Sequence, residues 1–285
     1  MSMLAFDAGG TQIRFSLLSR NAVVKPAAFP LPGSYRAFLS LLREQAGRLL
    51  GSSHCRLVIG GIAGPLNAKK SGLVQSTHLP FLIGRNLRQD ITRLLKTRVF
   101  LENDNALAGL GEAAYGAGEG YRIVAYIGIG TGIGGSRCID GRLDENAFGF
   151  EPGHHFLSMF ARHGTHASPH PGDWESMVSG SGIQQRFGVR AERLKNRSAW
   201  KGLAKETAYG LVNVAVFWSP QVIIVGGSLI KTLSVAEIRR HFRHLLRVFP
   251  VRPKILRAEL GNFGALWGAL AFSKELGWGS ERGNA

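Results

Sequence analysis

The chain has 285 residues, 45% of them hydrophobic, which is enough to bury a substantial core and to divide it between two domains. Lys and Arg number 35 against 19 Asp and Glu, and the resulting net charge of +16 favours anionic partners: nucleotides, polyphosphate, nucleic acid or an anionic membrane surface. No apolar run approaches the ~20 residues that cross a bilayer, no signal peptide precedes the first strand, and the two cysteines form no disulfide framework, so we expect a cytoplasmic protein with no membrane partner.

The first predicted element is a β-hairpin whose strands, residues 3–6 and 13–18, flank the turn Asp7-Ala-Gly-Gly-Thr11. Glycine lets a ligand approach the backbone closely, and the N–H groups of such a turn form an anion-binding nest. Asp7 would reach a metal ion or its water shell. By itself, a Gly-Gly turn between two strands more often has only a structural role and binds no ligand.

A helix is predicted over 34–50, with Ser34 as its cap and Gly51 at its end. The next strand, residues 56–59, runs into Gly60-Gly-Ile-Ala-Gly-Pro65, so that a second segment, including Gly64, is available to a ligand. An ordinary strand-to-loop exit explains this stretch equally well.

A helix over 86–95 and a strand over 98–101 follow, and the strand ends in Glu102-Asn103-Asp104-Asn105 before a helix over 106–115. Helix capping by Asn103 or Asp104 accounts for one of these side chains but not for the cluster. Ligands of open α/β sheets bind at the carboxyl ends of strands. A carboxylate there is a candidate general base, and an amide suits a sugar hydroxyl.

The strand 122–127, the turn Gly128-Ile-Gly-Thr-Gly-Ile-Gly-Gly135 and the strand 136–139 repeat the design of the first hairpin. Two matching hairpins indicate a duplicated domain that holds phosphates from both sides. Neither has the setting of a P-loop or of a Rossmann motif. We expect an N-terminal domain over 1–105 and a larger domain over 106–285.

Helices are predicted over 173–187 and 199–218, and the strand 221–225 leads into Gly226-Gly227, where adenine would lie against the backbone. A simple strand-to-helix turn would look the same. Basic residues gather between Arg239 and Arg257, and the apolar positions from Ile238 to Phe249 fall at helical spacing. We therefore interpret the arginines as the solvated face of an amphipathic helix, with nucleic acid as the less favoured explanation.

Taken together, these motifs resemble the ROK (repressor, open reading frame, kinase) family and bacterial glucokinases of the actin-like ATPase superfamily, from Asp7 to about Phe272. The similar segments are Asp7-x-Gly-Gly-Thr11, Ala63-Gly-Pro65 with Thr77-His-Leu-Pro80, Glu102-Asn-Asp104, Gly130-Thr-Gly-Ile-Gly-Gly135, Glu151-Pro-Gly-His154, Trp174-Glu175 and Val225-Gly-Gly-Ser228. The resemblance implies an α/β fold of two domains with duplicated mixed sheets (ribonuclease H-like) and an interdomain cleft, and a final helix at about 262–276 that packs near the hinge.

The resemblance also implies a role for each matching residue. Asp104 would be the catalytic base that takes the proton of a sugar 6-hydroxyl. The sugar ligands would be Gly64, Asn103, Asp104, Glu151, His154 and Glu175. The ATP-binding residues would be Asp7, Gly9, Gly10, Thr11, Gly130, Thr131, Gly132, Gly134, Gly226 and Gly227, with Asp7 holding Mg²⁺ through water.

One stretch departs from the family pattern. Many members have a Cys-x-Cys-Gly-x-x-Gly-Cys zinc site just before the Trp174-Glu175 position, whereas this chain has His166-Ala-Ser-Pro-His-Pro-Gly-Asp173 and no cysteine there. Thiolates make that kind of site tight. His154, His163, His166, His170 and Asp173 would be a replacement set, but histidines in a Pro/Gly-rich loop are more often solvated, and we expect no zinc.

The favoured function is an ATP- and Mg²⁺-dependent hexokinase acting on the 6-hydroxyl of glucose or a close relative. An N-acetylmannosamine or N-acetylglucosamine kinase is the alternative, and the +16 charge leaves polyphosphate open as a donor. A sugar-responsive repressor is disfavoured because only six residues precede Asp7, which leaves no room for a helix-turn-helix. A sugar-binding module without catalytic activity is disfavoured because the chain retains Asp104, the residue that matches the catalytic base. A homodimer is left open.

Overall fold

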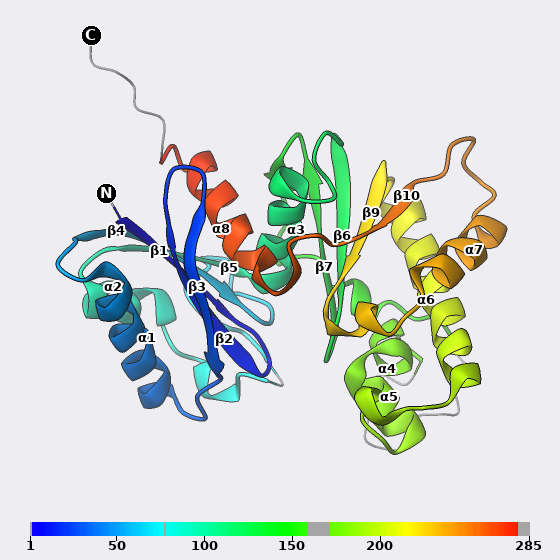
Figure 1. Ribbon diagram of the computed structural model, residues 1–285, viewed down its shortest axis with the longest axis horizontal. Helices are drawn as coiled ribbons and strands as arrows, with labels where there is room; N and C mark the ends of the chain where they lie inside the picture. The colour runs from blue at the N-terminus through cyan, green and yellow to red at the C-terminus, as the bar shows by residue number, and fades with distance from the viewer. Residues whose placement is uncertain (1, 77, 159–171, 279–285) are drawn as a thin grey trace, which may run out of the picture. The chain divides into compact units, whose positions relative to one another are not determined.

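The computed structural model describes residues 2–76, 78–158 and 172–278. The chain forms two compact units (Figure 1): the first contains Met1–Tyr115, Glu145–Gly149 and Asn262–Ala285, and the second contains Gly116–Asp144 and Phe150–Gly261. Each unit is built on a mixed five-stranded sheet, which confirms the α/β class with duplicated sheets. The domain boundary at 105/106 stays a prediction, because compactness does not establish independent folding.

In the first unit the sheet order is β3-β2-β1-β4-β5, with β1, β2 and β3 antiparallel and β1, β4 and β5 parallel. The strands are β1 Ser2–Ala8, β2 Gln12–Leu18, β3 Val23–Pro30, β4 Cys55–Ile62 and β5 Arg98–Asn103. The helices are α1 Tyr35–Leu50, α2 Leu87–Leu95, α3 Asp104–Tyr115 and α8 Gly264–Glu275, with short 3₁₀ turns at Pro80–Leu82 and Gly261–Phe263.

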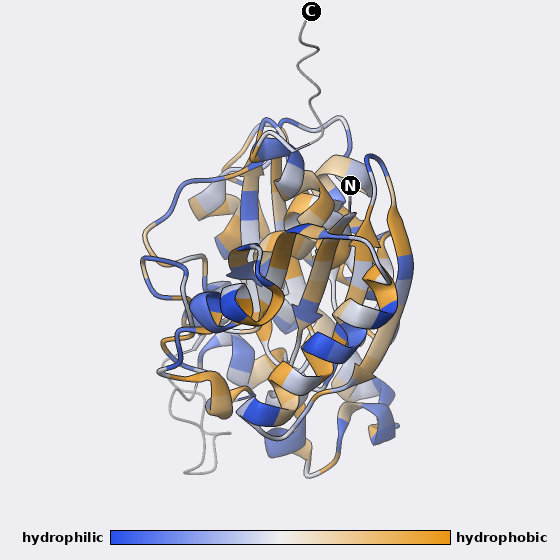
Figure 2. Cartoon of the chain, turned by 90° about the vertical axis from the view of Figure 1, so that its left-hand side faces the viewer, coloured by the Kyte–Doolittle hydropathy of each residue, from blue (hydrophilic) through white to orange (hydrophobic). Residues whose placement is uncertain are grey.

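Alternate residues of each strand face opposite sides of this sheet, and both sides are covered. Leu4 and Phe6 of β1 join a core formed with α1 and α2, whereas Met3 and Ala5 join a core formed with α3 and α8. Figure 2 shows the strands mainly in hydrophobic colours and the helices banded with hydrophilic residues, as expected of elements that bury one face. The sequence-predicted caps of α1 are confirmed, since Oγ of Ser34 accepts from the N–H of Ala37 and Gly51 has a positive φ of 56°.

The second unit has the order β10-β9-β6-β7-β8, again with a glycine-turn hairpin and parallel partners. Its strands are β6 Ile123–Ile129, β7 Ile133–Ile139, β8 Arg142–Leu143, β9 Val222–Gly226 and β10 Lys254–Arg257. Its helices are α4 Trp174–Val178, α5 Gly180–Phe187, α6 Arg197–Trp218 and α7 Val235–Leu245, with 3₁₀ turns at Pro152–His154, Ala191–Arg193 and Ser228–Lys231. Side chains of these helices and of β6 and β9 form its core.

Two helix predictions in this unit were wrong in extent. The helix predicted over 173–187 is interrupted at Ser179, whose extended backbone (ψ 167°) ends α4 and whose hydroxyl caps α5 by accepting from the N–H of Gly182. The helical spacing predicted through Phe249 ends at Leu245. Leu246 is buried all the same, because the chain after α7 turns back over the core.

None of the described helices is both long enough and apolar enough to span a bilayer.

Candidate active site

The first glycine turn, Asp7–Thr11, joins β1 to β2. The N–H of Gly9 donates to the carbonyl of Gln12 at 3.0 Å, and this bond tightens the turn. A Cβ on Gly10 would lie 3.1 Å from Cγ of His78, so the loop that carries His78 packs directly against the turn. Gly10 is therefore held in a place where a larger residue would displace that loop.

Asp7 is buried and lies opposite Arg14 in the hairpin. Oδ2 of Asp7 accepts from Nη1 of Arg14 at 3.0 Å, whereas Oδ1 is buried without a hydrogen-bond partner. Burial raises the pKa of Asp7, and the charge of Arg14 opposes that rise. An unsatisfied carboxylate oxygen is the kind of ligand that Mg²⁺ or its water shell takes, so this residue fits the metal-holding role predicted for it.

The carboxyl end of β5 carries Glu102, Asn103 and Asp104. Both polar atoms of the Asn103 amide bond within the chain: Oδ1 accepts from the N–H groups of Asn105 (2.9 Å) and Ala106 (3.1 Å), and Nδ2 donates to the carbonyl of Gly64 at 3.2 Å. Asn103 thus caps α3 and ties the Gly64 loop to the strand end. Its role as a sugar ligand stays a prediction.

Asp104 begins α3, where its Oδ1 accepts from the backbone N–H of Asn105 at 2.9 Å. Gly61 of β4 lies between Asp7 and Asp104: a Cβ built on it would be 3.3 Å from Oδ1 of Asp7 and 3.5 Å from Cα of Asp104. The first unit therefore brings the candidate metal-holding carboxylate and the candidate base together at the carboxyl-terminal end of its parallel strands, where ligands of open α/β sheets bind.

Gly64 has φ +120°, a conformation that L side chains rarely adopt, and a Cβ there would lie 2.8 Å from the carbonyl of Gln75. Glu102, beside the candidate base, pairs with Lys70 of the same loop region and accepts from the N–H of Asn103 at 3.0 Å. Lys70 and Asn103 both connect the loop after β4 to the end of β5.

The second glycine turn, Gly128–Gly135, joins β6 to β7 in the second unit. The carbonyls of Gly130 and Thr131 accept from the N–H groups of Gly180 and Ser181 at the start of α5. Oε2 of Glu175 accepts from the N–H of Ile133 at 2.7 Å, and a Cβ on Gly132 would lie 2.5 Å from that oxygen. The candidate sugar ligand Glu175 therefore lies directly against the candidate phosphate turn.

Gly226 is the last residue of β9, Gly227 follows it, and both lie beside the same turn. A Cβ on Gly227, whose φ is +89°, would meet the carbonyl of Ile129 at 2.3 Å, and a Cβ on Gly130 would lie 3.5 Å from Oγ of Ser228. Within this unit the two segments predicted to hold ATP are thus in contact.

The segment Glu151-Pro-Gly-His154 packs on β7, where a Cβ on Gly153 would lie 2.4 Å from the carbonyl of Ile133. Burial raises the pKa of Glu151, and the charge of Glu175 acts in the same direction. Nδ1 of His154 lies 3.0 Å from Oδ2 of Asp173, and this hydrogen bond raises the pKa of His154. Glu151, His154 and Glu175 are thus electrostatically coupled, as expected of residues that share a site.

Asp173, which is buried, also accepts from the N–H of Ser176 as the cap of α4. Burial alone would raise its pKa, but its hydrogen bonds to His154 and Ser176 leave that pKa lowered. Among the described residues, no group of three or more His, Cys, Asp or Glu side chains is placed to hold a metal ion. His163, His166 and His170 lie outside those residues.

Sequence reasoning missed Arg14 and the pairing of Asp173 with His154. Arg14 had a signal in the sequence, because the hairpin register around the first glycine turn places it opposite Asp7. Asp173 and His154 were grouped in the sequence only as members of a possible metal site, and their hydrogen bond across 19 residues is a tertiary contact.

The model of the ROK family matches residues 3–275. The chain belongs to the ROK family. The N-acetylgalactosamine kinase AgaK of Shewanella sp. (strain ANA-3) is 28% identical over 92% of this chain and 94% of its own length. The glucokinase of Streptomyces coelicolor is 24% identical over 95% of this chain and 97% of its own length.

Among solved structures, the ROK glucokinase of Streptomyces griseus in complex with glucose and AMPPNP has a TM-score of 0.81, at 21% identity, over 96% of this chain and 100% of that one. This likeness confirms the fold. The functional roles of the individual site residues stay predictions, because none of these findings tests them.

Proposed function

We propose that this ROK-family sugar kinase transfers the γ-phosphoryl group of ATP to the 6-hydroxyl of glucose or a closely related hexose. The proposal rests on one observation above the others: Asp7 and Asp104 both lie against Gly61, at the strand ends where the first glycine turn and the Gly64 loop also lie. A base and a metal-holding carboxylate at one edge are what phosphoryl transfer to an alcohol requires.

In this mechanism Asp104 accepts the proton of the 6-hydroxyl as the hydroxyl oxygen forms a bond to the γ-phosphorus. The bond from that phosphorus to the bridging oxygen of ADP breaks, and the products are hexose 6-phosphate and ADP. The backbone N–H groups of the two glycine turns donate to the phosphates and so offset their charge. Mg²⁺, held by Asp7 through water, supplies further neutralisation of that charge when it is bound.

Sugar recognition is assigned to Gly64, Asn103, Glu151, His154 and Glu175. Carboxylates accept hydrogen bonds from hydroxyl groups, and an imidazole either donates or accepts, so this set orients a ring that carries several hydroxyls. The coupling of Glu151, His154 and Glu175 supports their placement around one ligand.

An N-acyl hexosamine is the second candidate substrate, and the similarity to an N-acetylgalactosamine kinase favours it. The two candidates differ at C2, where an acyl group needs apolar space that a hydroxyl does not. At this level of identity the relatives include kinases of both kinds of sugar.

The test is an assay of sugar phosphate formation over glucose, mannose, N-acetylglucosamine, N-acetylmannosamine and N-acetylgalactosamine, with ATP and polyphosphate offered separately as donors. We expect the highest kcat/KM with ATP and glucose or its epimer. A higher kcat/KM for an acylated sugar would replace the first candidate by the second, and no turnover with any hexose would overturn the proposal.

A further inference from the structure

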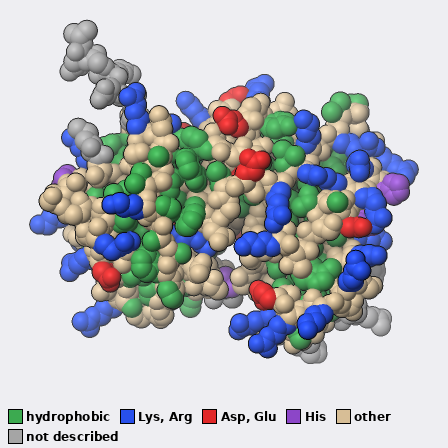
Figure 3. Space-filling view, viewed as in Figure 1, with side chains coloured by type: hydrophobic (Ala, Val, Ile, Leu, Met, Phe, Trp, Pro, Cys, Tyr) green, Lys and Arg blue, Asp and Glu red, His purple; other side chains and the backbone are tan. Residues whose placement is uncertain are grey.

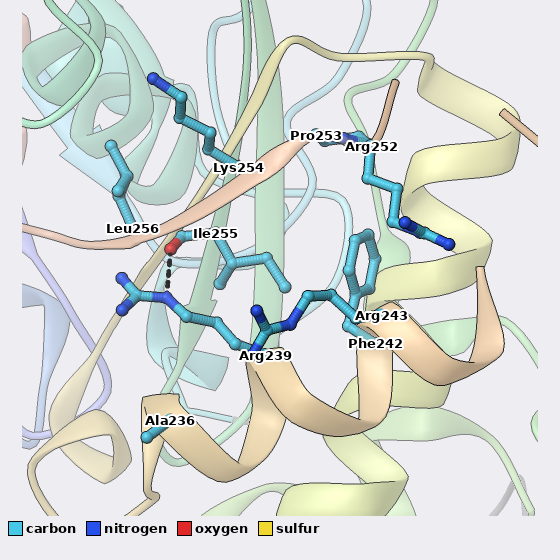
Figure 4. A pocket seen from close by; sticks show the side chains of 9 residues that line it. All are labelled: Ala236, Arg239, Phe242, Arg243, Arg252, Pro253, Lys254, Ile255 and Leu256. Atoms are coloured by element: carbon cyan, nitrogen blue, oxygen red, sulfur yellow. Dashed lines mark hydrogen bonds between the residues drawn. The ribbon is translucent and has the colours of Figure 1, made fainter. Parts of the chain in front are cut away.

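The second unit contains a pocket that the proposed phosphoryl transfer does not use. It has a volume of ≈ 650 Å³ and lies between α7 and the segment that leads into and forms β10 (Figure 4). Its lining residues are Ala236, Arg239, Phe242, Arg243 and the five consecutive residues Arg252 to Leu256. This volume is within the range of about 300–1,000 Å³ that is usual for small-molecule sites.

The pocket combines an apolar floor with a cationic rim. Phe242 and Ile255 belong to the buried core, and Ala236, Pro253 and Leu256 add further apolar surface. The rim carries four cations, and none of the nine lining residues is acidic. On the face of the molecule shown in Figure 3, Lys and Arg side chains gather on the side where Figure 1 places α7.

The two sides of α7 differ in how their charges are paired. Away from the pocket, Arg240 and His241 both approach Glu237. In contrast, the cations that line the pocket make no ion pair with any acidic residue in the part of the chain that the structure describes. Arg239 and Arg243 are also four residues apart on the same helix face, a spacing at which like charges repel. A bound anion would offset this repulsion.

Of the two arginines on α7 that line the pocket, Arg239 is partly fixed before any ligand arrives. Nε of Arg239 donates to the carbonyl of Ile255 at 2.7 Å, which leaves the two terminal nitrogens as its remaining donors. Figure 4 shows Arg239 and Arg243 extending from α7 across the pocket, whereas Arg252 and Lys254 point outward in different directions. Because Arg239 is already positioned, less conformational entropy is lost when it binds an anion.

We propose that this pocket binds a phosphorylated small molecule, whose phosphate accepts hydrogen bonds from Arg239 and Arg243 and whose carbon skeleton lies on Ala236, Phe242 and Ile255. A phosphate monoester carries a charge of about −1.5 to −2 at pH 7, which matches two guanidinium groups better than a single carboxylate does. An apolar floor beside the two cations fits a compact molecule rather than a polymer, which needs cations spaced along its path.

The proposal is tested by titration calorimetry with phenyl phosphate and with inorganic phosphate as probes. Neither probe is a substrate or product of the proposed reaction. We expect wild-type protein to bind phenyl phosphate more tightly than inorganic phosphate, and the double variant Arg239→Gln/Arg243→Gln to bind at least about tenfold more weakly, as the loss of two charge-assisted contacts implies. Arg240→Gln, on the other side of α7, is the matched control and should bind as the wild type does.

Arg239 also bonds to the backbone of β10, so the double variant is checked by circular dichroism and by its sugar kinase activity, which should be unchanged. If its fold is altered, Arg243→Gln alone serves, because the side chain of Arg243 makes no hydrogen bond or ion pair with any described residue. Equal binding by wild type and variant, or no binding of either probe by the wild type, would overturn the proposal. If the protein bound duplex DNA and neither of the two probes, the proposal would be overturned, and nucleic acid would be the favoured ligand of this surface.

Discussion

Asp104 occupies a position that serves structure and chemistry at once. It is the first residue of α3, and Oδ1 of its carboxylate accepts from the backbone and side-chain nitrogens of Asn105. A carboxylate held in this way at a strand end is suited to accept a proton from a substrate hydroxyl.

Replacing Asp104 with Asn tests its role as the base. Asn is itself a good residue at a helix start, so the fold should be retained. We expect kcat to fall by about 10²- to 10⁴-fold, while the dissociation constant of the hexose changes little. Steady-state kinetics and calorimetric sugar binding measure the two quantities. Asp140→Asn, which removes an exposed pair with Arg122, is the control, and near-normal turnover of the Asp104 variant would remove Asp104 from this role.

The pair of His154 and Asp173 predicts a pH-dependent stability. The charged groups facing His154 are Asp173, Glu175 and Glu151, and all of them act to raise its pKa. A raised folded-state pKa contributes stability that is fully present below the unfolded value of 6.5 and is lost as the pH rises through the folded value. The lowered pKa of Asp173 contributes stability that is present above 3.8 and is lost as the pH falls through its folded value.

Asp173→Asn should therefore destabilise the protein more at about pH 5.5 than at about pH 9, because only the ionised carboxylate attracts an imidazolium. Asn keeps the cap of α4, so the loss of helix capping is avoided. The measurement is urea unfolding across this pH range. The matched control is Asp144→Asn, whose partner Arg137 stays charged throughout, so its effect should not vary with pH. A pH-independent effect of Asp173→Asn would contradict the prediction.

At the residue scale, the sequence predicted those site features whose residues are close together in the chain. The two glycine turns were recognisable because their glycines and flanking strands are contiguous, and the cluster at 102–104 because strand ends collect ligands. The contact of Gly10 with His78 and the pairing of Lys70 with Glu102 were not recognisable, because loops that are far apart in the sequence bring these residues together.

Helices α3 and α8 of the first unit illustrate a feature of whole elements. They meet through glycines: a Cβ on Gly268 would lie 1.7 Å from the carbonyl of Leu107, and a Cβ on Gly111 would lie 2.4 Å from the carbonyl of Gly264. The two backbones are therefore in direct contact. Since Asp104 begins α3, this contact also supports the position of the candidate base.

Gly268→Ala should destabilise the protein, because its methyl group would force the two helices apart. We expect a loss of about 1–3 kcal/mol in the free energy of unfolding, the range seen when well-packed regions are overfilled. Gly202→Ala in α6 is the matched control, since nothing lies within 4 Å of its added Cβ and alanine is the better helix former. Chemical unfolding of both variants measures the difference. Equal stability of the two variants would mean that the helices separate easily.

Among the elements, the sequence predicted most long helices and both hairpins but missed the two-residue strand β8 and the longer strands β3 and β10. β3 has no regular alternation, with Pro26 in its middle, and β10 has four residues of which two are basic. Both are edge strands. Edge strands often carry charged residues or proline, which prevent pairing with other chains and also weaken the sequence pattern of a strand. The end of α7 was missed because Leu246 continues the apolar spacing after the helix has stopped.

At the scale of the whole molecule, the net charge of +16 is the feature that the proposed reaction explains least. Several cations are paired, among them Arg14, Arg137 and Arg186, each with a partly buried or buried acid. The excess must nevertheless remain, because there are 16 more basic than acidic residues. Folding brings these charges closer together, and their mutual repulsion opposes the compact state.

Screening this repulsion should stabilise the protein. Raising NaCl from about 0.01 M to about 0.1 M shortens the Debye length from about 30 Å to about 10 Å. The unfolding midpoint at pH 7 should rise, because salt weakens the repulsion among the excess positive charges. Salt also weakens exposed ion pairs, but each of these contributes at most about 1 kcal/mol to stability. Thermal unfolding followed by circular dichroism measures the shift, and a falling midpoint would mean that ion pairs outweigh repulsion. Sodium phosphate at equal ionic strength should stabilise further if the pocket at Arg239 and Arg243 binds phosphate, and the double variant should lose only that additional stabilisation.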